Sequence, residues 1–175
     1  MKTIVIYKTK YGSTKTYAEW ISEELHAEMR EASTVKPAEL MEYDTIIYGG
    51  GLYAEVIAGV SLITKNIEKL QDKKLIVYTT GITPPACREY YEKEVVEKNF
   101  KNGMYSKIKM FNFPGKMVLS ELTVVHRTAI KTLKKIMSDK KDPTDMEKLL
   151  ITLCDADGDF SDKSCIRELV AYAQA

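Results

Sequence analysis

The chain has 175 residues, of which 45% are hydrophobic and 29% charged, and its formal net charge is +1. These values are typical of a soluble globular protein, and the length favours one domain, residues 1–175, with a full hydrophobic core. No apolar run reaches the length of a transmembrane helix, and the N-terminus has the pattern of a strand rather than of a signal peptide, so we expect a cytoplasmic protein.

The first predicted elements are a strand and a helix joined by a hydroxyl-rich loop. Residues 4–7, Ile-Val-Ile-Tyr, lack polar alternation, which is typical of a strand buried on both faces of a parallel sheet. From Thr14 onward, apolar residues recur every three or four positions and predict an amphipathic helix; they are Ala18, Ile21, Leu25 and Met29. A loop in this position suits an anion, because the first N–H groups of a helix lack partners and the helix dipole favours negative charge.

The loop itself consists of Thr9, Lys10, Tyr11, Gly12, Ser13 and Thr14. The hydroxyls of Thr9, Ser13 and Thr14 are neutral hydrogen-bond donors, and Gly12 lets the main chain approach a ligand closely. The loop lacks the first glycine of a Walker A motif and has one glycine where a dinucleotide fingerprint needs three. The alternative is an ordinary strand-to-helix turn in which the hydroxyls serve only as helix caps.

This pattern resembles the FMN-phosphate loop of flavodoxins. Eight positions over seventeen residues hold residue types that the family signature allows: Val5, Ile6, Tyr7, Thr9, Gly12, Thr14, Ala18 and Ile21. The resemblance implies a flavodoxin-like α/β fold, a three-layer αβα sandwich whose five-stranded parallel sheet has the order 2-1-3-4-5. It also implies FMN as cofactor, bound beyond the carboxyl ends of the strands.

Further strands and helices alternate along the chain. We expect strands at about 31–35, 45–48, 75–78 and 107–113, the last at a sheet edge, with loops at 49–53 and 79–85. Between them we expect a helix carrying Val60, Ile63, Ile67 and Leu70, and another from about 86 to 98. The alternation, without hairpin dipeptides, predicts right-handed βαβ units and a parallel sheet.

Residues 114–160 exceed this plan and form a predicted insertion. A helical stripe within it consists of Leu122, Val125, Ala129, Leu133 and Ile136, with a cluster of lysines near its end: Lys131, Lys134, Lys135, Lys140 and Lys141. One interpretation is an amphipathic helix that lies on the domain with solvated lysines. The other is a basic amphipathic surface that contacts a partner or membrane lipid, as a peripheral contact through residues 117–141.

The sequence gives no support for a metal site. Asp155, Asp157 and Asp159 resemble a calcium loop, but Gly158 precedes the third acidic residue and Ile166 stands where the final glutamate belongs. The three cysteines, Cys87, Cys154 and Cys165, are odd in number and form no C-x-x-C pair, which argues against both a disulfide framework and zinc. We therefore interpret 155–159 as an acidic turn before a last helix, with Ser161 as N-cap, Asp162 in its first turn and an apolar face of Ile166, Leu169, Val170 and Ala173.

The flavodoxin resemblance implies that three segments hold FMN. The first is the loop from Thr9 to Thr14, for the phosphate. The second contains Gly50, Gly51, Leu52 and Tyr53, with Tyr53 expected to flank the isoalloxazine, and the third contains Thr80, Gly81, Ile82 and Thr83. We expect no catalytic side chain, because the chemistry belongs to the flavin. His26 and His126 are accordingly expected to be surface residues.

Three functions follow from this resemblance. The first is an FMN-binding electron-transfer protein whose partner is a redox protein, or a quinone or other small-molecule substrate; no nucleic-acid partner is expected. The net charge of +1 departs from the strongly acidic surface of flavodoxins that dock on basic partners. The chain layout also resembles that of menaquinone-dependent protoporphyrinogen dehydrogenases, which implies an FMN-dependent oxidoreductase acting from a porphyrinogen to a quinone. The third function is a regulatory flavodoxin-like module without flavin.

Overall fold

Five parallel strands form the central sheet of the computed structural model, which describes residues 2–83, 88–101 and 103–175. They are β1 (Thr3–Lys8), β2 (Glu28–Glu31), β3 (Thr45–Tyr53), β5 (Lys74–Gly81) and β6 (Ile108–Pro114). Their order is β2-β1-β3-β5-β6, and the short β4 (Val56–Ile57) pairs antiparallel with the end of β3. Counted along the parallel strands, this is the predicted order 2-1-3-4-5, with β6 at the edge as expected.

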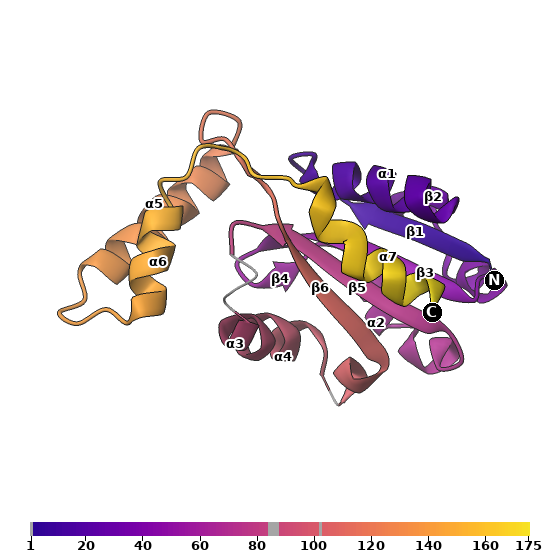
Figure 1. The fold of residues 1–175 in the computed structure, drawn as a ribbon. Coiled ribbons are helices and arrows are strands. Elements are labelled where there is room, and N and C mark those ends of the chain that lie inside the picture. The colour runs from indigo at the N-terminus through magenta and orange to yellow at the C-terminus, as the bar shows by residue number, and fades with distance from the viewer. Residues whose placement is uncertain (1, 84–87, 102) are drawn as a thin grey trace.

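Helices cover both faces of the sheet. Figure 1 shows α1 (Ser13–Leu25) and α7 (Arg167–Gln174) on one face, and α2 (Ser61–Thr64), α3 (Arg88–Tyr90) and α4 (Glu97–Asn99) on the other. Because successive strand residues point to opposite faces, Ile4 and Ile6 lie in one core cluster and Val5 in the other. The predicted three-layer sandwich is confirmed.

The first helix ends earlier than its apolar spacing predicts. His26 adopts a left-handed conformation (φ 49°, ψ 42°), and the N–H of Ala27 donates to the carbonyl of Ser22. Met29 therefore belongs to β2 rather than to the helix. The strand expected at 31–35 is also displaced, because β2 spans Glu28–Glu31 and a 3₁₀ turn, η1 (Ala32–Thr34), follows it.

Gly49, Gly50 and Gly51 are part of β3 and not of a loop, which corrects the prediction for this segment. Gly49 and Gly50 pair with β1, and all three glycines pair with β5. A Cβ on Gly49 would lie 2.1 Å from Cζ of Tyr78, and one on Gly50 would lie 2.5 Å from Cγ2 of Ile57. The glycines thus let large side chains pack against the strand, which continues to Tyr53. Thr79, Thr80 and Gly81, expected in the next loop, likewise belong to β5.

The helices of the middle region are more broken than predicted. The helix expected around residues 60–70 is divided into α2 and a 3₁₀ helix, η3 (Ile67–Leu70), although all four predicted apolar residues are buried. The next consists of α3, a π-helical segment, η4 (Tyr91–Val96), and α4, while residues 84–87, including its predicted start, lie outside the described residues. A further 3₁₀ helix, η5 (Met104–Lys107), leads into β6.

The predicted insertion is a helical hairpin on a short two-stranded stem. Strands β7 (Lys116–Met117) and β8 (Gly158–Asp159) pair antiparallel and enclose α5 (Val124–Ser138) and α6 (Asp145–Leu153). Figure 1 shows the hairpin extending away from the sheet. Helix α5 packs against α6 and buries Met137, whereas Val125, Leu133 and Ile136 remain 74%, 47% and 58% exposed. The interpretation that this apolar stripe lies on the domain is therefore wrong.

The last helix has a different N-cap from the one predicted after the acidic turn. An Asp157 carboxylate oxygen accepts the N–H of Leu119, and the described residues contain no group that could hold a metal ion. Asp162 rather than Ser161 caps η6 (Lys163–Ile166), the 3₁₀ turn that opens α7, because its carboxylate accepts the N–H of Ser164. Within the same described ranges, no helix is long and apolar enough to span a membrane.

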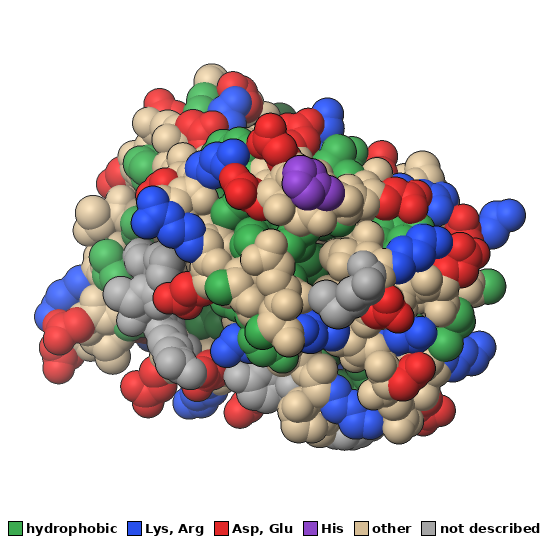
Figure 2. Space-filling view, turned by 45° about the vertical axis from the view of Figure 1, so that its right-hand side comes forward, with side chains coloured by type: hydrophobic (Ala, Val, Ile, Leu, Met, Phe, Trp, Pro, Cys, Tyr) green, Lys and Arg blue, Asp and Glu red, His purple; other side chains and the backbone are tan. Residues whose placement is uncertain are grey.

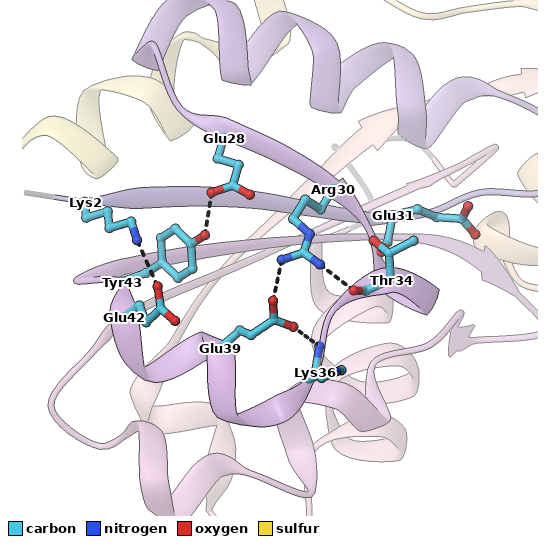
Figure 3. A network of polar contacts seen from close by, with 9 residues as sticks. All are labelled: Lys2, Glu28, Arg30, Glu31, Thr34, Lys36, Glu39, Glu42 and Tyr43. Atoms are coloured by element: carbon cyan, nitrogen blue, oxygen red, sulfur yellow. Dashed lines mark hydrogen bonds and ion pairs between the residues drawn. The ribbon is translucent and has the colours of Figure 1, made fainter.

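A polar network stabilises the edge of the sheet at β2. The Arg30 guanidinium donates to a carboxylate oxygen of Glu39 at 2.9 Å and to the carbonyl of Thr34 (Figure 3). The second oxygen of Glu39 accepts the N–H of Lys36, at the start of η2 (Pro37–Glu42). Glu39 thus joins the edge strand to the segment that precedes β3.

We expect Glu39→Gln to make the free energy of unfolding less dependent on pH in the acid range. The hydrogen bond from Arg30 holds the pKa of the Glu39 carboxyl below its ordinary value of 4.5. Because the folded pKa is depressed, the contribution of this carboxylate is present above about pH 4.5 and is lost as pH falls through the folded pKa. Urea unfolding between pH 3 and 7 should show a shallower acid slope for the variant. Glu42→Gln, in the same 3₁₀ helix, is the control, since Glu42 pairs with Lys2 at the surface; an equal change there would contradict the prediction.

Candidate functional site

The three predicted segments meet at the carboxyl ends of β1, β3 and β5. The hydroxyl oxygens of Thr14 and Thr80 are 2.7 Å apart in a buried hydrogen bond, which joins the first segment to the third. The rings of Tyr11 and Tyr53 contact edge to face with centroids 6.1 Å apart, which joins the first to the second. A site assembled from all three segments therefore lies at the switch point beside β1.

The main chain of the loop at 9–14 turns sharply at Gly12, whose φ is +100°. Its N–H donates to Oγ1 of Thr9 at 3.0 Å, and the N–H of Lys116 donates to Oγ of Ser13 at 2.7 Å. In both bonds the hydroxyl oxygen accepts, so its hydrogen can still be donated to an anion. Gly12 is the N-cap of α1 and no side chain caps the helix, so these hydroxyls do not act as helix caps.

Buried tyrosines hold the first turn of α1 in place through hydrogen bonds to main-chain groups. The Tyr78 hydroxyl donates to the carbonyl of Thr14 at 2.9 Å. The Tyr17 hydroxyl donates to the carbonyl of Pro114 and accepts the N–H of Asp162, at 2.9 and 3.0 Å. Burial raises the pKa of Tyr17 to about 12, so it stays protonated at neutral pH. The loop is thus held in place before any ligand binds.

The second segment brings Tyr53 over this loop. Burial raises the pKa of the Tyr53 hydroxyl to about 12. Ala54 and Glu55, with φ of 47° and 61°, form the turn into β4, and the carboxylate of Glu55 bonds Tyr90 and Lys98. Gly50 and Gly51 are buried within β3, while Leu52 is partly buried. The expected contact of Tyr53 with a flavin ring stays a prediction.

The third segment is anchored from the neighbouring edge strand. Asn112 of β6 donates from Nδ2 to the carbonyl of Thr83 at 2.9 Å, and its Oδ1 accepts from Thr79 at 3.0 Å. Thr80 and Thr83 are buried, whereas Gly81 and Ile82 are partly exposed. Gly81 and Ile82 are therefore the residues of this segment nearest to solvent, although the carbonyl of Gly81 already accepts the N–H of Gly115 at 2.9 Å.

His126 of α5 also belongs to the site, which the sequence did not predict. Its Nδ1 is 2.7 Å from the Tyr11 hydroxyl, and its ring centroid is 5.0 Å from that of Tyr53. Burial and the positive charge of Lys10 lower the pKa of His126. His26 is exposed, as predicted, and His126 is partly exposed, but its contact with Tyr11, 115 positions away, had no local sequence signal.

Sheet order and site position define a doubly wound α/β protein with an anion-suited loop at the switch point. The chain belongs to the flavodoxin family: a family model described as a flavodoxin domain matches residues 4–145. Membership of this family implies a flavin cofactor.

Individual similar proteins are distant. An uncharacterized protein of Methanocaldococcus jannaschii is 28% identical over 100 residues, which cover 56% of this chain and 65% of that protein. Among solved structures, oxidised flavodoxin 2 of Bacillus cereus is 21% identical, with 64% of this chain and 84% of that chain covered and a TM-score of 0.43. The Trp repressor binding protein of Bacillus subtilis is 15% identical, with 66% and 85% covered and a TM-score of 0.47.

Proposed function

We propose that the protein binds FMN at the carboxyl ends of β1, β3 and β5 and transfers electrons. The observation that carries the proposal is the donor set of the loop at 9–14. It combines the N-terminus of a 13-residue helix with the Thr9 and Ser13 hydroxyls, whose oxygens already accept main-chain bonds. It contains no carboxylate. This set fits a phosphate group, because it is electropositive and its donors are preorganised.

The other two segments would hold the ring system. Tyr53 and the Tyr11 ring offer apolar faces beside the loop, and the partly exposed Gly81 and Ile82 would contribute the polar contacts of the third segment. When bound, the flavin supplies the electron-accepting and electron-donating chemistry. The side chains of the site orient it and exclude water, and no protein nucleophile is required.

Titration of the purified protein with FMN and with riboflavin tests this proposal. We expect quenched flavin fluorescence and shifted visible absorption, with FMN bound at least about 100-fold more tightly than riboflavin, because riboflavin lacks the phosphate. Equal affinities would remove the assigned role of the loop. No binding of either ligand at micromolar protein would overturn the proposal and favour the flavin-free regulatory module.

The position of His126 favours a second candidate function, an FMN-dependent oxidoreductase of the protoporphyrinogen dehydrogenase type. A side chain of the insertion reaches the rim of the site, where it contacts both Tyr11 and Tyr53. A substrate wall built by the insertion suits an enzyme better than a carrier. Turnover of a porphyrinogen with a quinone acceptor, lost in His126→Ala while FMN stays bound, would support this candidate. FMN binding without any turnover would leave the carrier, whose partner would be a redox protein.

The surface charge bears on the choice of partner. Acidic and basic side chains are interspersed over the face of the molecule shown in Figure 2, which brings forward the right-hand side of Figure 1. A redox partner that recognises this face would do so with little electrostatic steering.

We also propose a peripheral membrane contact through residues 117–141. Val124 and Val125 are 77% and 74% exposed. Ile136 is 58% exposed and lies about three turns further along α5. Apolar side chains on a basic helix favour an anionic lipid interface. Co-sedimentation with phosphatidylserine vesicles, weakened in Val125→Asp and in Ile136→Asp, would support the contact; binding that survives both changes would contradict it.

A further inference from the structure

The helical insertion contains a cavity of its own, separate from the candidate flavin site. It has a volume of about 420 Å³ and lies between α5 and the chain that follows α6. Its charged lining consists of Arg127, Lys131, Lys134 and Asp155. None of these residues belongs to the three segments that meet at β1, β3 and β5, and the volume lies within the usual range for pockets that hold small organic ligands.

Helix geometry brings the three cations of this cavity together. Arg127, Lys131 and Lys134 stand four and three residues apart and therefore project from one face of α5 over successive turns. Asp155 contributes the carboxylate of the lining and pairs with Lys134, with Nζ 2.6 Å from an oxygen. The positive charges of Arg127 and Lys131 are left in excess, so the cavity favours an anion.

Arg127 is the best oriented of the three. Its Nη2 donates to the carbonyls of Ser120 and Leu122 at 3.1 and 3.2 Å, which fixes the guanidinium plane. Its Nε is buried and has no hydrogen-bond partner among the residues that the structure describes. Because Nε exposes almost no surface, a ligand in the cavity would meet the rest of the guanidinium, whose fixed positive charge favours an oxyanion.

Apart from Ser120, the remaining residues that line the cavity are apolar. Ile130 lies on the same stretch of α5, Leu119 precedes the helix, and Cys154, which is buried, follows α6. Inorganic phosphate would leave these walls without a contact. A ligand that joins an oxyanion to an apolar group matches both parts of the lining.

We propose that this cavity binds an amphiphilic oxyanion, a phosphate or carboxylate carried by an apolar group. The oxyanion is placed between the guanidinium of Arg127 and Nζ of Lys131, and the apolar group lies against Ile130 and Cys154. The assignment does not depend on the flavin site, because no residue of the three flavin-site segments lines this cavity.

Amide chemical shifts of the ¹⁵N-labelled full chain test this site, with phenyl phosphate, benzoate and inorganic phosphate as probes. We expect saturable shifts at Ile130, Lys131 and Asp155 with phenyl phosphate or benzoate, and the tighter of the two identifies the preferred oxyanion. Inorganic phosphate should bind about tenfold more weakly, because it leaves the apolar walls unused. Shifts at residues 9–14 would report the flavin site separately.

Lys131→Met and Lys135→Met form a matched pair of variants. Both remove an exposed lysine from α5, but Lys135 is not part of the cavity. We expect Lys131→Met to weaken the binding of the organic probe about tenfold, through loss of one charge-assisted hydrogen bond, and Lys135→Met to leave it unchanged. Equal losses in the two variants, or organic probes that shift residues 9–14 alone, would overturn the assignment.

Discussion

Replacement of Gly49 by alanine is expected to destabilise the fold by about 3 kcal/mol, the upper end of the usual cost of overpacking. The new Cβ would lie 2.1 Å from Cζ and 2.3 Å from the hydroxyl oxygen of Tyr78. Tyr78 cannot simply turn aside, because its side chain is fully buried and its hydroxyl bonds the carbonyl of Thr14. The strand or the ring must therefore shift within a closely packed core.

Urea unfolding would measure this loss of stability. Two further variants test whether the clash with Tyr78 causes it. Gly158→Ala is the matched control, since its Cβ would meet Phe160 at an ordinary 3.6 Å, and we expect a change within about 0.5 kcal/mol. In a Tyr78→Leu background, the Gly49→Ala change should cost less than it does in the native chain, because the ring atoms in its way are gone. Additive effects of the two changes would show that the clash is not the cause.

The packing of Gly49 against Tyr78 also shows why more of the fold than of the site could be predicted from the sequence. The order of the sheet follows from alternating apolar strands and helices, and local spacing records it along the whole chain. The three glycines after Tyr48 carry the opposite local signal. Glycine is typical of loops, yet Gly49 and Gly50 are needed in a strand because Tyr78 and Ile57 occupy the space of their side chains. That requirement arises from side chains outside the strand, on β4 and β5, which the pattern of the glycine segment itself does not contain.

The insertion shows that local sequence patterns are equally limited in predicting the site. Its apolar stripe predicted a helix correctly, but periodicity alone does not say which face packs or against what. The Thr9 to Thr14 loop was predictable because its donors are contiguous. His126 was not, because it reaches Tyr11 through a hairpin whose direction is set by the β7–β8 stem. Hydrogen-bond donors that are contiguous in the chain can be recognised from the sequence, whereas side chains brought together by tertiary packing need the structure.

Ser13→Asp is expected to weaken FMN binding at least about 100-fold, a loss of about 2.7 kcal/mol. Ser13 is the first residue of α1, and its Oγ lies within the loop assigned to the phosphate. A carboxylate there would face a phosphate that also carries negative charge, and at about 4 Å near a protein surface such repulsion is about 4 kcal/mol per pair of charges. Fluorescence titration with FMN measures the loss.

Loss of folding would not explain such a result. An aspartate oxygen can accept the N–H of Lys116 as Oγ of Ser13 does, and a negative charge at the first turn of a helix is favourable. Ser13→Asn is the control, because it has the size of aspartate without the charge, and it should retain most of the affinity. Riboflavin should bind Ser13→Asp and the native chain alike, since it lacks the phosphate. A loss of riboflavin affinity as large as that of FMN would mean that Ser13 contacts the ring or its side chain rather than the phosphate, and the phosphate would then have to be assigned to other residues.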